Sequence, residues 1–347
     1  MPVTEMQCAP PGWRASRIRL GLSVAANPDP ALHAFAGARP VHFVLDSGAA
    51  RHWSHLACGT DPIRVDGGES CKDIRSLEGL LRELARRGVT REHCLVVVGG
   101  GAVCDLGGLA AALCLRGIDH VLVPTTLLAM VDASVGGKTA IDLPEGKNLV
   151  GVFHQPVEVL IDPEFVHTES DDRYRAGLAE IAKVAIGLDA DLFERCERDA
   201  SALRARDRNR LRAAIEAAVA AKIRIVESDP GEAGSRRLLN LGHTLGHALE
   251  AHSGFVTPHG LAVAQGLHHV LALAVKRGLL SPEHARRAGG LLAALGLPRE
   301  ALPSPGALLP FVARDKKVRG DQVAAVLPID LGRARIVAMT PHEFLAV

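Results

Sequence analysis

The stretch "CLVVVGGGAVCDLGG", from Cys94 to Gly108, decides the fold class. Its first five residues are apolar without alternation, which is typical of a strand buried on both faces of a parallel sheet. Three glycines follow, and a segment with helical periodicity comes after them. A strand that turns this tightly into a helix lets the backbone approach a phosphate group, and the helix N-terminus attracts anions. The run lacks the G-x-G-x-x-G order, so an ordinary strand–helix turn explains the glycines equally well.

Outward from this stretch, the first half of the chain alternates strand-like and helix-like segments. Val41–Asp46 and His120–Thr126 are predicted strands, and helices are predicted near Ala49–His55 and over 76–88 and 105–117. The alternation predicts an α/β Rossmann-like domain with a parallel sheet over 1–165. The remainder, 166–347, is predicted to be a mostly α-helical domain, with strand-like segments only over 322–329 and 334–339. We expect the active site in the cleft between the two domains.

Composition excludes several classes of protein. The chain has 347 residues and a net charge of +1, from 40 basic and 39 acidic residues. This balance argues against a general nucleic-acid or membrane-surface binder. No uncharged apolar run reaches about 18 residues, and the N-terminus lacks a signal-peptide pattern, so a cytoplasmic location is expected. Seven scattered cysteines without a C-x-x-C pair favour reduced thiols over a disulfide framework.

Four histidines lie in "LNLGHTLGHALEAHSGFVTPHG", Leu239 to Gly260. His243 and His247 are four residues apart and would share one face of a helix, a spacing compatible with zinc. The H-E-x-x-H order of zinc proteases is missing, and a solvated helix face explains the pair as well. A catalytic zinc needs three protein ligands, so a carboxylate is the natural third. Glu180 is the candidate because it lies among apolar residues; an ion pair with Lys183 is the alternative.

Two further polar clusters suggest anion binding. The segment Pro124–Asn148 carries lysines beside paired glycines, which suits a phosphate. Asp132 replaces the first glycine of a P-loop ahead of Gly137–Thr139, which argues against a nucleoside triphosphatase. If a helix begins near Arg236, Asn240 could share its histidine-bearing face. Solvated surface cations remain the simpler interpretation of each basic residue in the second cluster, which comprises Lys222, Arg236, Lys316 and Lys317.

Taken together, these segments resemble the 3-dehydroquinate synthases of the sugar phosphate cyclase family, in order from about Asp66 to Pro328. The matching pieces are "DGGESCK", "GGGAVCDLGGLAAALCLRG", "VPTTLLAMVDASVGGKTAIDLPEGKNLVGVFHQP", "GLAEIAK", "EAGSRRLLNLGHTLGHALE", "HG" and "RDKKV". The resemblance implies conversion of 3-deoxy-D-arabino-heptulosonate 7-phosphate to 3-dehydroquinate and phosphate in the shikimate pathway. The implied steps are NAD-mediated oxidation, phosphate elimination, reduction and intramolecular aldol cyclisation.

The resemblance also implies roles for individual residues. A zinc or cobalt ion would be held by Glu180, His243 and His259, whereas His252 matches no functional position. The implied NAD contacts are Asp46, Glu69, Lys72, Gly99, Gly100, Gly101, Asp105, Thr125, Thr126, Lys138 and Lys147. The implied substrate contacts are Asp132, Lys138, Asn148, Lys183, Lys222, Glu232, Arg236, Asn240, His247 and Lys316. Arg116 matches an arginine that reaches the neighbouring subunit's phosphate site, which implies a homodimer.

One departure keeps other functions open. The family usually carries Glu directly after the "HG" pair, where this chain has Leu261. The alternatives are a paralogous sugar phosphate cyclase of specialised metabolism, such as an aminodehydroquinate synthase, a metal- and NAD-dependent oxidoreductase resembling alcohol dehydrogenases, and a non-catalytic binding protein. The retained Arg236, His247 and Asp-Lys-Lys stretch (315–317) favour a substrate that carries a carboxylate.

Overall fold

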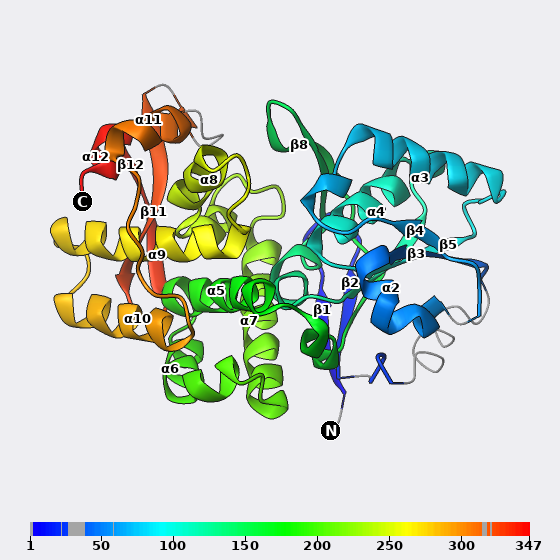
Figure 1. Cartoon of the computed structure of the whole chain (residues 1–347), viewed down its shortest axis with the longest axis horizontal. Helices are drawn as coiled ribbons and strands as arrows, with labels where there is room; N and C mark the ends of the chain where they lie inside the picture. The colour runs from blue at the N-terminus through cyan, green and yellow to red at the C-terminus, as the bar shows by residue number, and fades with distance from the viewer. Residues whose placement is uncertain (1–2, 22, 27–38, 58, 314–317, 320) are drawn as a thin grey trace. The chain divides into compact units, whose positions relative to one another are not determined.

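The computed structural model describes residues 3–21, 23–26, 39–57, 59–313, 318–319 and 321–347 (Figure 1). The chain divides into two compact units, Met1–Glu169 and Ser170–Val347. The sequence places this boundary at 165/166. We describe each unit by itself.

Unit 1 is built on a seven-stranded sheet in the order β1-β2-β9-β6-β5-β3-β4. The strands are parallel except for the antiparallel pair β1–β2 at one edge. All six residues of β5 are buried, as expected for the apolar segment that opened the sequence analysis. The predicted parallel sheet is therefore confirmed, with one antiparallel strand added. The strand bounds are β1 Thr4–Cys8, β2 Ser16–Leu20, β3 Val41–Asp46, β4 Ile63–Val65, β5 Cys94–Gly99, β6 Asp119–Pro124 and β9 Glu158–Ile161.

The main helices of unit 1 are α2 (Ser47–Trp53), α3 (Ile74–Arg86) and α4 (Gly101–Leu113). A Cβ at Gly107 of α4 would lie 2.6 Å from a methyl group of Val97, so the glycine lets α4 pack directly on β5. The helix predicted over 105–117 begins earlier and stops at Leu113, where the short 3₁₀ turn η3 (Cys114–Arg116) takes over. Other 3₁₀ turns are η1 (Ser54–Ala57), η2 (Glu69–Cys71) and η5 (Pro163–Thr168).

The glycine-broken segment after Pro124 is ordered and not a simple loop. It forms a π-helical turn, η4 (Ala129–Ala133), and a two-stranded antiparallel hairpin, β7 (Lys138–Leu143) with β8 (Gly146–Phe153). Lys138 and Thr139 therefore open a strand, whereas a P-loop places these residues at the start of a helix. This observation agrees with the exclusion of a P-loop from the sequence.

Unit 2 is mostly helical, as predicted. Its helices are α5 (Asp171–Leu188), α6 (Ala190–Arg204), α7 (Arg208–Ser228), α8 (His243–His252), α9 (His259–Lys276), α10 (Pro282–Ala294), α11 (Pro305–Ala313) and α12 (Pro341–Leu345), with a 3₁₀ turn η6 (Ser235–Asn240). The strands β10 (Val318–Arg319), β11 (Gln322–Asp330) and β12 (Arg333–Met339) form a small antiparallel sheet. Across the described ranges, no helix combines the length and apolarity needed to cross a membrane.

Two glycines allow α9 to approach its neighbours at backbone distance. A Cβ at Gly260 would lie 2.1 Å from the carbonyl oxygen of Ala176 in α5. A Cβ at Gly266 would lie 1.9 Å from the carbonyl oxygen of Gly242, just before α8. Real Cβ atoms essentially never come this close, so only glycine is compatible with this packing. The start of α9, the start of α8 and the middle of α5 are thereby brought together.

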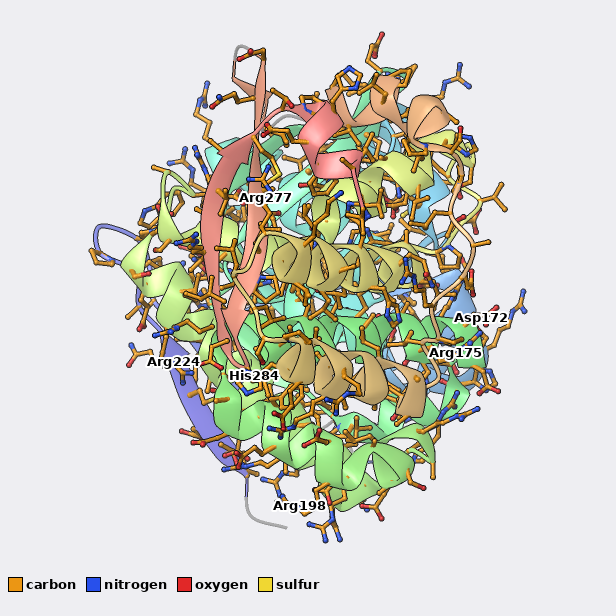
Figure 2. The ribbon with its side chains drawn as sticks, turned by 90° about the vertical axis from the view of Figure 1, so that its left-hand side faces the viewer. Asp172, Arg175, Arg198, Arg224, Arg277 and His284 are labelled. Atoms are coloured by element: carbon orange, nitrogen blue, oxygen red, sulfur yellow. The ribbon has the colours of Figure 1, made fainter. Side chains whose placement is uncertain are left out.

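Charged side chains of unit 2 form local pairs, one of which, Asp172 with Arg175, is labelled in Figure 2. Arg175 bonds to Asp172 within the first turns of α5. Arg224 donates to Asp189 at 2.8 Å, and Nδ1 of His284 lies 3.0 Å from a carboxylate oxygen of Asp330. Pairs at a protein surface are screened by water and contribute little to stability. They differ from the buried cations described below.

Candidate functional site

Glu180, His243 and His259 converge in unit 2. Glu180 lies in the middle of α5 with 1% of its surface exposed, and the two histidines are the first residues of α8 and α9. Nε2 of His243 lies 3.9 Å from Oε1 of Glu180, and Nε2 of His259 lies 3.7 Å from the same oxygen. One ligand atom from each residue lies within 4.8 Å of the other two. The three predicted metal ligands are therefore neighbours.

Hydrogen bonds on the outer side of each histidine leave the inner nitrogens as acceptors. Nδ1 of His243 lies 3.2 Å from the carbonyl oxygen of Leu241, and Nδ1 of His259 lies 2.9 Å from Oε2 of Glu250. A carbonyl or a carboxylate only accepts, so each Nδ1 carries a proton, and in the neutral imidazole each Nε2 keeps a lone pair. Among the described residues, Oε1 of Glu180 accepts no hydrogen bond, whereas Oε2 meets the ammonium of Lys183. Three acceptors facing one point fit a bound divalent cation.

Lys183 lies one turn after Glu180 and forms an ion pair with its Oε2. Both side chains are almost fully buried, at 3% and 1% exposure. The ion pair that the sequence offered as the alternative is therefore present. The ion pair occupies Oε2, and Oε1 faces the two histidines. Glu180 can therefore pair with Lys183 and also serve as a metal ligand.

The basic cluster of unit 2 is partly buried. Arg236 is 1% exposed and lies in η6, where its Nη1 donates to the carbonyl oxygen of Pro230 at 2.8 Å. Lys222 in α7 is also buried. A buried guanidinium is costly unless it meets acceptors or an anion. These two cations are therefore not ordinary surface charges.

The helix that the sequence analysis considered as beginning near Arg236 does not form. Residues Arg236 and Asn240 belong to η6, and α8 begins only at His243. Gly242 separates the two elements with a φ of +78°, a left-handed conformation that ends the first turn. The shared helix face inferred from the spacing of Arg236 and Asn240 therefore does not exist.

Asp229 shapes this loop and was missed by sequence reasoning. Its carboxylate accepts from the backbone N–H groups of Ala233, Gly234 and Arg236 at 2.7–2.9 Å. Burial opposes ionisation, but these bonds outweigh it and lower the pKa of Asp229. The Asp-Pro-Gly turn signal at 229–231 could have pointed to such a residue.

The remaining predicted substrate residues of unit 2 lie close by where the structure describes them. Nδ2 of Asn240 donates to Glu232 at 3.3 Å. The ring of His247 lies 5.5 Å from that of His243 and 5.9 Å from that of His259, measured between centroids. His252, at the other end of α8, is exposed. Lys316 lies outside the described residues.

The glycine turn of unit 1 joins β5 to α4. A Cβ at Gly99 would lie 2.7 Å from Cβ of Val103, and one at Gly101 would lie 3.2 Å from Cβ of Ala133. Thr125 donates its backbone N–H to the Gly99 carbonyl at 2.9 Å, and Thr126 caps the following turn. Gly100 is the N-cap of α4 and provides no side-chain cap. The first N–H groups of α4 are thus available to an anion, while close packing also accounts for the glycines.

Asp46 lies at the end of β3 and caps α2. Its Oδ1 accepts from the backbone of Gly48 at 2.7 Å and of Ala49 at 3.3 Å. A Cβ at Gly67 would lie within 2.5 Å of this carboxylate, so glycine keeps one side of Asp46 clear. The predicted ribose-binding position is therefore at the carboxyl edge of the sheet, where such folds bind ligands.

Five predicted residues of unit 1 form one polar cluster around buried Lys72. Its Nζ donates to Asp105 at 2.8 Å, contacts Oδ1 of Asn148 and lies 3.7 Å from Glu69. Lys147 lies 3.4 Å from Glu69. Burial acts to lower the pKa of Lys72, but the carboxylates of Asp105 and Glu69 outweigh it and raise the pKa. Lys72 therefore stays charged.

Asp142 completes this cluster and was not predicted. It accepts the backbone N–H of Asn148 at 2.7 Å, and its own N–H donates to the carbonyl of Lys72 at 2.7 Å. Asn148 has a φ of +53°. Asp142 thus fixes the hairpin turn against Lys72. Of the other predicted residues, Asp132 is half-buried in η4 and Lys138 is exposed at the start of β7.

Burial raises the pKa of Asp105 to about 6, although the ammonium of Lys72 opposes the shift. Between its ordinary value of 3.8 and about 6, the folded state therefore binds more protons than the unfolded state. The stability contributed by this group is fully present below pH 3.8 and is lost as the pH rises through about 6. We expect Asp105→Asn to remove this slope and to change the pH 4 to pH 7 difference in unfolding free energy by about 1–3 kcal/mol, measured in urea.

The matched control is Asp61→Asn, which alters an exposed aspartate paired with Arg87. It should leave the slope unchanged. If the unfolding free energies of wild type and Asp105→Asn depended on pH in the same way, the raised pKa of Asp105 would be contradicted.

Comparison with known proteins decides the family. The 3-dehydroquinate synthase N-terminal family matches residues 62–176, and the 3-dehydroquinate synthase C-terminal family matches residues 177–318. The chain belongs to the 3-dehydroquinate synthase family. The 3-dehydroquinate synthase of Geobacter metallireducens is 44% identical over 82% of this chain and 81% of its own. That of Paracoccus denitrificans is 38% identical over 93% and 92%. The resemblance identified from the sequence is thereby confirmed.

Solved structures relate this 3-dehydroquinate synthase family member to other cyclases and to a wider fold group. A 2-epi-5-epi-valiolone synthase from Streptomyces hygroscopicus, solved with NAD⁺ and Zn²⁺, is 28% identical over 97% of this chain and 96% of its own, with a TM-score of 0.87. An iron-containing alcohol dehydrogenase is 15% identical over 95% of each chain, with a TM-score of 0.61. The second likeness shows a shared fold alone.

Proposed function

We propose that this chain is a 3-dehydroquinate synthase, which converts 3-deoxy-D-arabino-heptulosonate 7-phosphate to 3-dehydroquinate and phosphate. The observation that carries the proposal is the convergence of Glu180, His243 and His259 in a member of this family. A divalent zinc or cobalt ion held there would act as a Lewis acid on a substrate hydroxyl, and NAD would accept and return a hydride. Unit 2 would bind the metal and most of the substrate, and unit 1 would bind NAD.

The proposed NAD site is supported by residues at the carboxyl edge of the sheet in unit 1. Asp46 would meet a ribose, and the uncapped N-terminus of α4 behind Gly100 would meet the pyrophosphate. Gly99, Gly100 and Gly101 carry no side chains, and their surroundings leave little room for any. A phosphate would therefore approach the backbone itself. The proposed NAD contacts are Asp46, Glu69, Lys72, Gly99, Gly100, Gly101, Asp105, Thr125, Thr126, Lys138 and Lys147.

For the substrate, the support is the set of buried cations. Arg236 and Lys222 would bind the carboxylate, since a buried guanidinium favours an anionic partner. Within unit 2, Asn240, His247 and Lys316 would bind the phosphate. Oriented in this way, the phosphate dianion could accept the neighbouring C–H proton before it leaves. The full proposed set is Asp132, Lys138, Asn148, Lys183, Lys222, Glu232, Arg236, Asn240, His247 and Lys316, with Arg116 of a second subunit.

A paralogous cyclase of specialised metabolism is the second candidate, favoured by the high structural similarity to the valiolone synthase. Buried Arg236 argues for a carboxylate-bearing substrate and therefore for the first candidate. The deciding experiment is phosphate release from the heptulosonate phosphate, with NAD far below the substrate concentration. The proposal predicts many turnovers per NAD and no net NADH. Stoichiometric NADH with a simple alcohol would instead indicate an oxidoreductase.

We further propose a homodimer in which Arg116 serves the partner's phosphate site. Leu115 and Arg116 are exposed and have φ values of +51° and +66°. Such conformations cost roughly 1–3 kcal/mol each in non-glycine residues and persist where the surroundings enforce them. The turn lies beside the end of β8, because Nε2 of His154 lies 3.0 Å from the Ile118 carbonyl. Apolar side chains are exposed at the end of α4, on the turn and on β8, which supports a surface that a partner subunit covers. They are Leu113, Leu115, Leu149, Val150 and Val152.

Co-expression of Arg116→Ala with His243→Ala tests this sharing. Each variant alone should be inactive. A mixed dimer keeps one complete site, built from the metal ligands of the first chain and Arg116 of the second. Half of the dimers should be mixed, so about a quarter of wild-type activity should return. Absence of recovery in a sample shown to contain mixed dimers would contradict a shared site.

Leu261, where the family usually has Glu, is expected to tune the metal centre without contacting substrate. It lies in the first turn of α9, about 200° around the helix from His259 at roughly 100° per residue. Changes behind a metal ligand typically alter metal affinity or activity by about 10–100-fold. We expect Leu261→Glu to tighten zinc binding, measured by chelator competition, with the accepted substrate unchanged. A switch in substrate preference would show that Leu261 lines the pocket and would favour the specialised paralogue.

The cysteines and the net charge bear on the expected location and partners. The six described cysteines are all free thiols, which supports the expected cytoplasmic location. The near-zero net charge supports a small-molecule substrate and no nucleic-acid or membrane partner.

A further inference from the structure

Glu250 is a buried carboxylate beside the candidate metal centre that the family resemblance did not single out. It lies in α8 with 1% of its surface exposed. Its Oε2 lies 2.9 Å from Nδ1 of His259, the first residue of α9. A carboxylate buried this deeply must meet a donor, and the imidazole N–H is one.

This contact determines which nitrogen of His259 faces the metal centre. An ionised Glu250 can only accept, so Nδ1 carries a proton, and in the neutral imidazole Nε2 keeps its lone pair. That Nε2 lies 3.7 Å from Oε1 of Glu180. His243 has the same tautomer by a different means, because its Nδ1 faces the neutral carbonyl of Leu241 at 3.2 Å. The two histidines therefore have outer partners of different charge.

We infer that Glu250 is a positioning residue for His259, which it holds as a charged hydrogen-bond acceptor so that Nε2 is directed at the metal. The inference rests on the proposed metal centre. A carboxylate on the outer nitrogen orients the ring and makes the inner nitrogen a stronger ligand. The first turn of α9 itself supplies no carboxylate, since Gly260, Leu261 and Ala262 follow His259.

The same residues could also be grouped as a second ion site, because ligand atoms of His247, Glu250 and His259 lie within 4.8 Å of one another. The distance of 2.9 Å between Nδ1 and Oε2 is that of an N–H···O hydrogen bond. An ion there would also have to displace the Nδ1 proton while Nε2 faces the other centre. The geometry therefore favours a hydrogen-bonded support over a second ion.

The test compares Glu250→Gln and Glu250→Leu in the full-length protein. Gln keeps an acceptor for Nδ1 but loses the charge, whereas Leu removes both. Zinc affinity, measured by competition with a chelator, should fall by about 10-fold for Gln and by about 100-fold for Leu. Zinc release should accelerate in the same order, and the visible spectrum of the cobalt-substituted protein should shift. A buried residue with a merely structural role would not change that spectrum.

Glu158→Gln is the matched control. Glu158 is also buried, at 2% exposure, and pairs with Arg19 in unit 1. Its loss should leave zinc affinity unchanged, which separates a local effect from general loss of stability. If Glu250→Leu does not fold, Glu250→Gln still decides the matter, provided that its circular dichroism matches wild type.

The outcomes separate the inference from the proposed function. Wild-type protein that binds no zinc would refute the metal centre itself. Wild-type protein that binds one zinc, with unchanged affinity and cobalt spectrum in folded Glu250→Gln, would overturn only the role of Glu250. Two zinc ions per wild-type chain, falling to one in Glu250→Gln, would show that Glu250 is a ligand and would also overturn it.

Discussion

His243→Ala is expected to abolish metal binding and turnover together. Removal of this imidazole leaves Glu180 and His259 as the only two of the three converging ligands. Catalytic zinc sites in proteins generally use three protein ligands, so two should not retain the ion at stoichiometric occupancy. NAD binding should be largely intact, because the proposed NAD contacts lie in unit 1. Metal content by elemental analysis, phosphate release and NAD titration measure the three properties.

His252→Ala is the control from the same helix. His252 is exposed and lies at the opposite end of α8 from His243. It should retain full metal content and full activity. Full metal content in His243→Ala would contradict the assignment of His243 as a metal ligand, whatever the activity of the variant.

Arg236→Lys is expected to weaken turnover of the carboxylate-bearing substrate. A guanidinium can bind the substrate carboxylate through two parallel hydrogen bonds, which an ammonium cannot reproduce. We expect a loss of about 2–3 kcal/mol of transition-state stabilisation, or roughly 30–150-fold in kcat/KM. Arg236 also donates to the Pro230 carbonyl, so part of the loss will come from the loop.

Two comparisons isolate the substrate contact. Arg237→Lys changes the half-buried neighbour and should have little effect. A substrate analogue without the carboxylate should lose less activity in Arg236→Lys than the substrate does, because only the loop contribution affects it. If the variant discriminates between substrate and analogue as well as wild type does, Arg236 does not bind the carboxylate.

The parts of the fold governed by local pattern could be predicted from the sequence. The apolar run at β5 predicted a buried parallel strand, and the periodic apolar residues of unit 2 predicted its helices. The break between η6 and α8 escaped prediction. Local periodicity continues through Gly242, and only the close packing of α9 against this residue reveals why the chain turns there.

The candidate metal ligands were found by resemblance, whereas three carboxylates that position predicted site residues were not. Asp142, Asp229 and Glu250 act through hydrogen bonds to partners on other elements or in a folded loop. The position of a carboxylate in a sequence does not indicate which hydrogen-bond donor it will contact in the folded protein. Asp142 pairs with the hairpin turn only because β7 and β8 form, and these strands lack a strong strand signal.

The backbone contacts of α9 limit how far its first residue can lie from α5. Gly260 abuts the Ala176 carbonyl one turn before Glu180, and Nε2 of His259 lies 3.7 Å from Oε1 of Glu180. A Cβ at position 260 would lie 2.1 Å from that carbonyl oxygen, so any larger residue would push the two helices apart. His259 would then move away from Glu180. The approach of two proposed ligands thus depends on a residue that has no side chain.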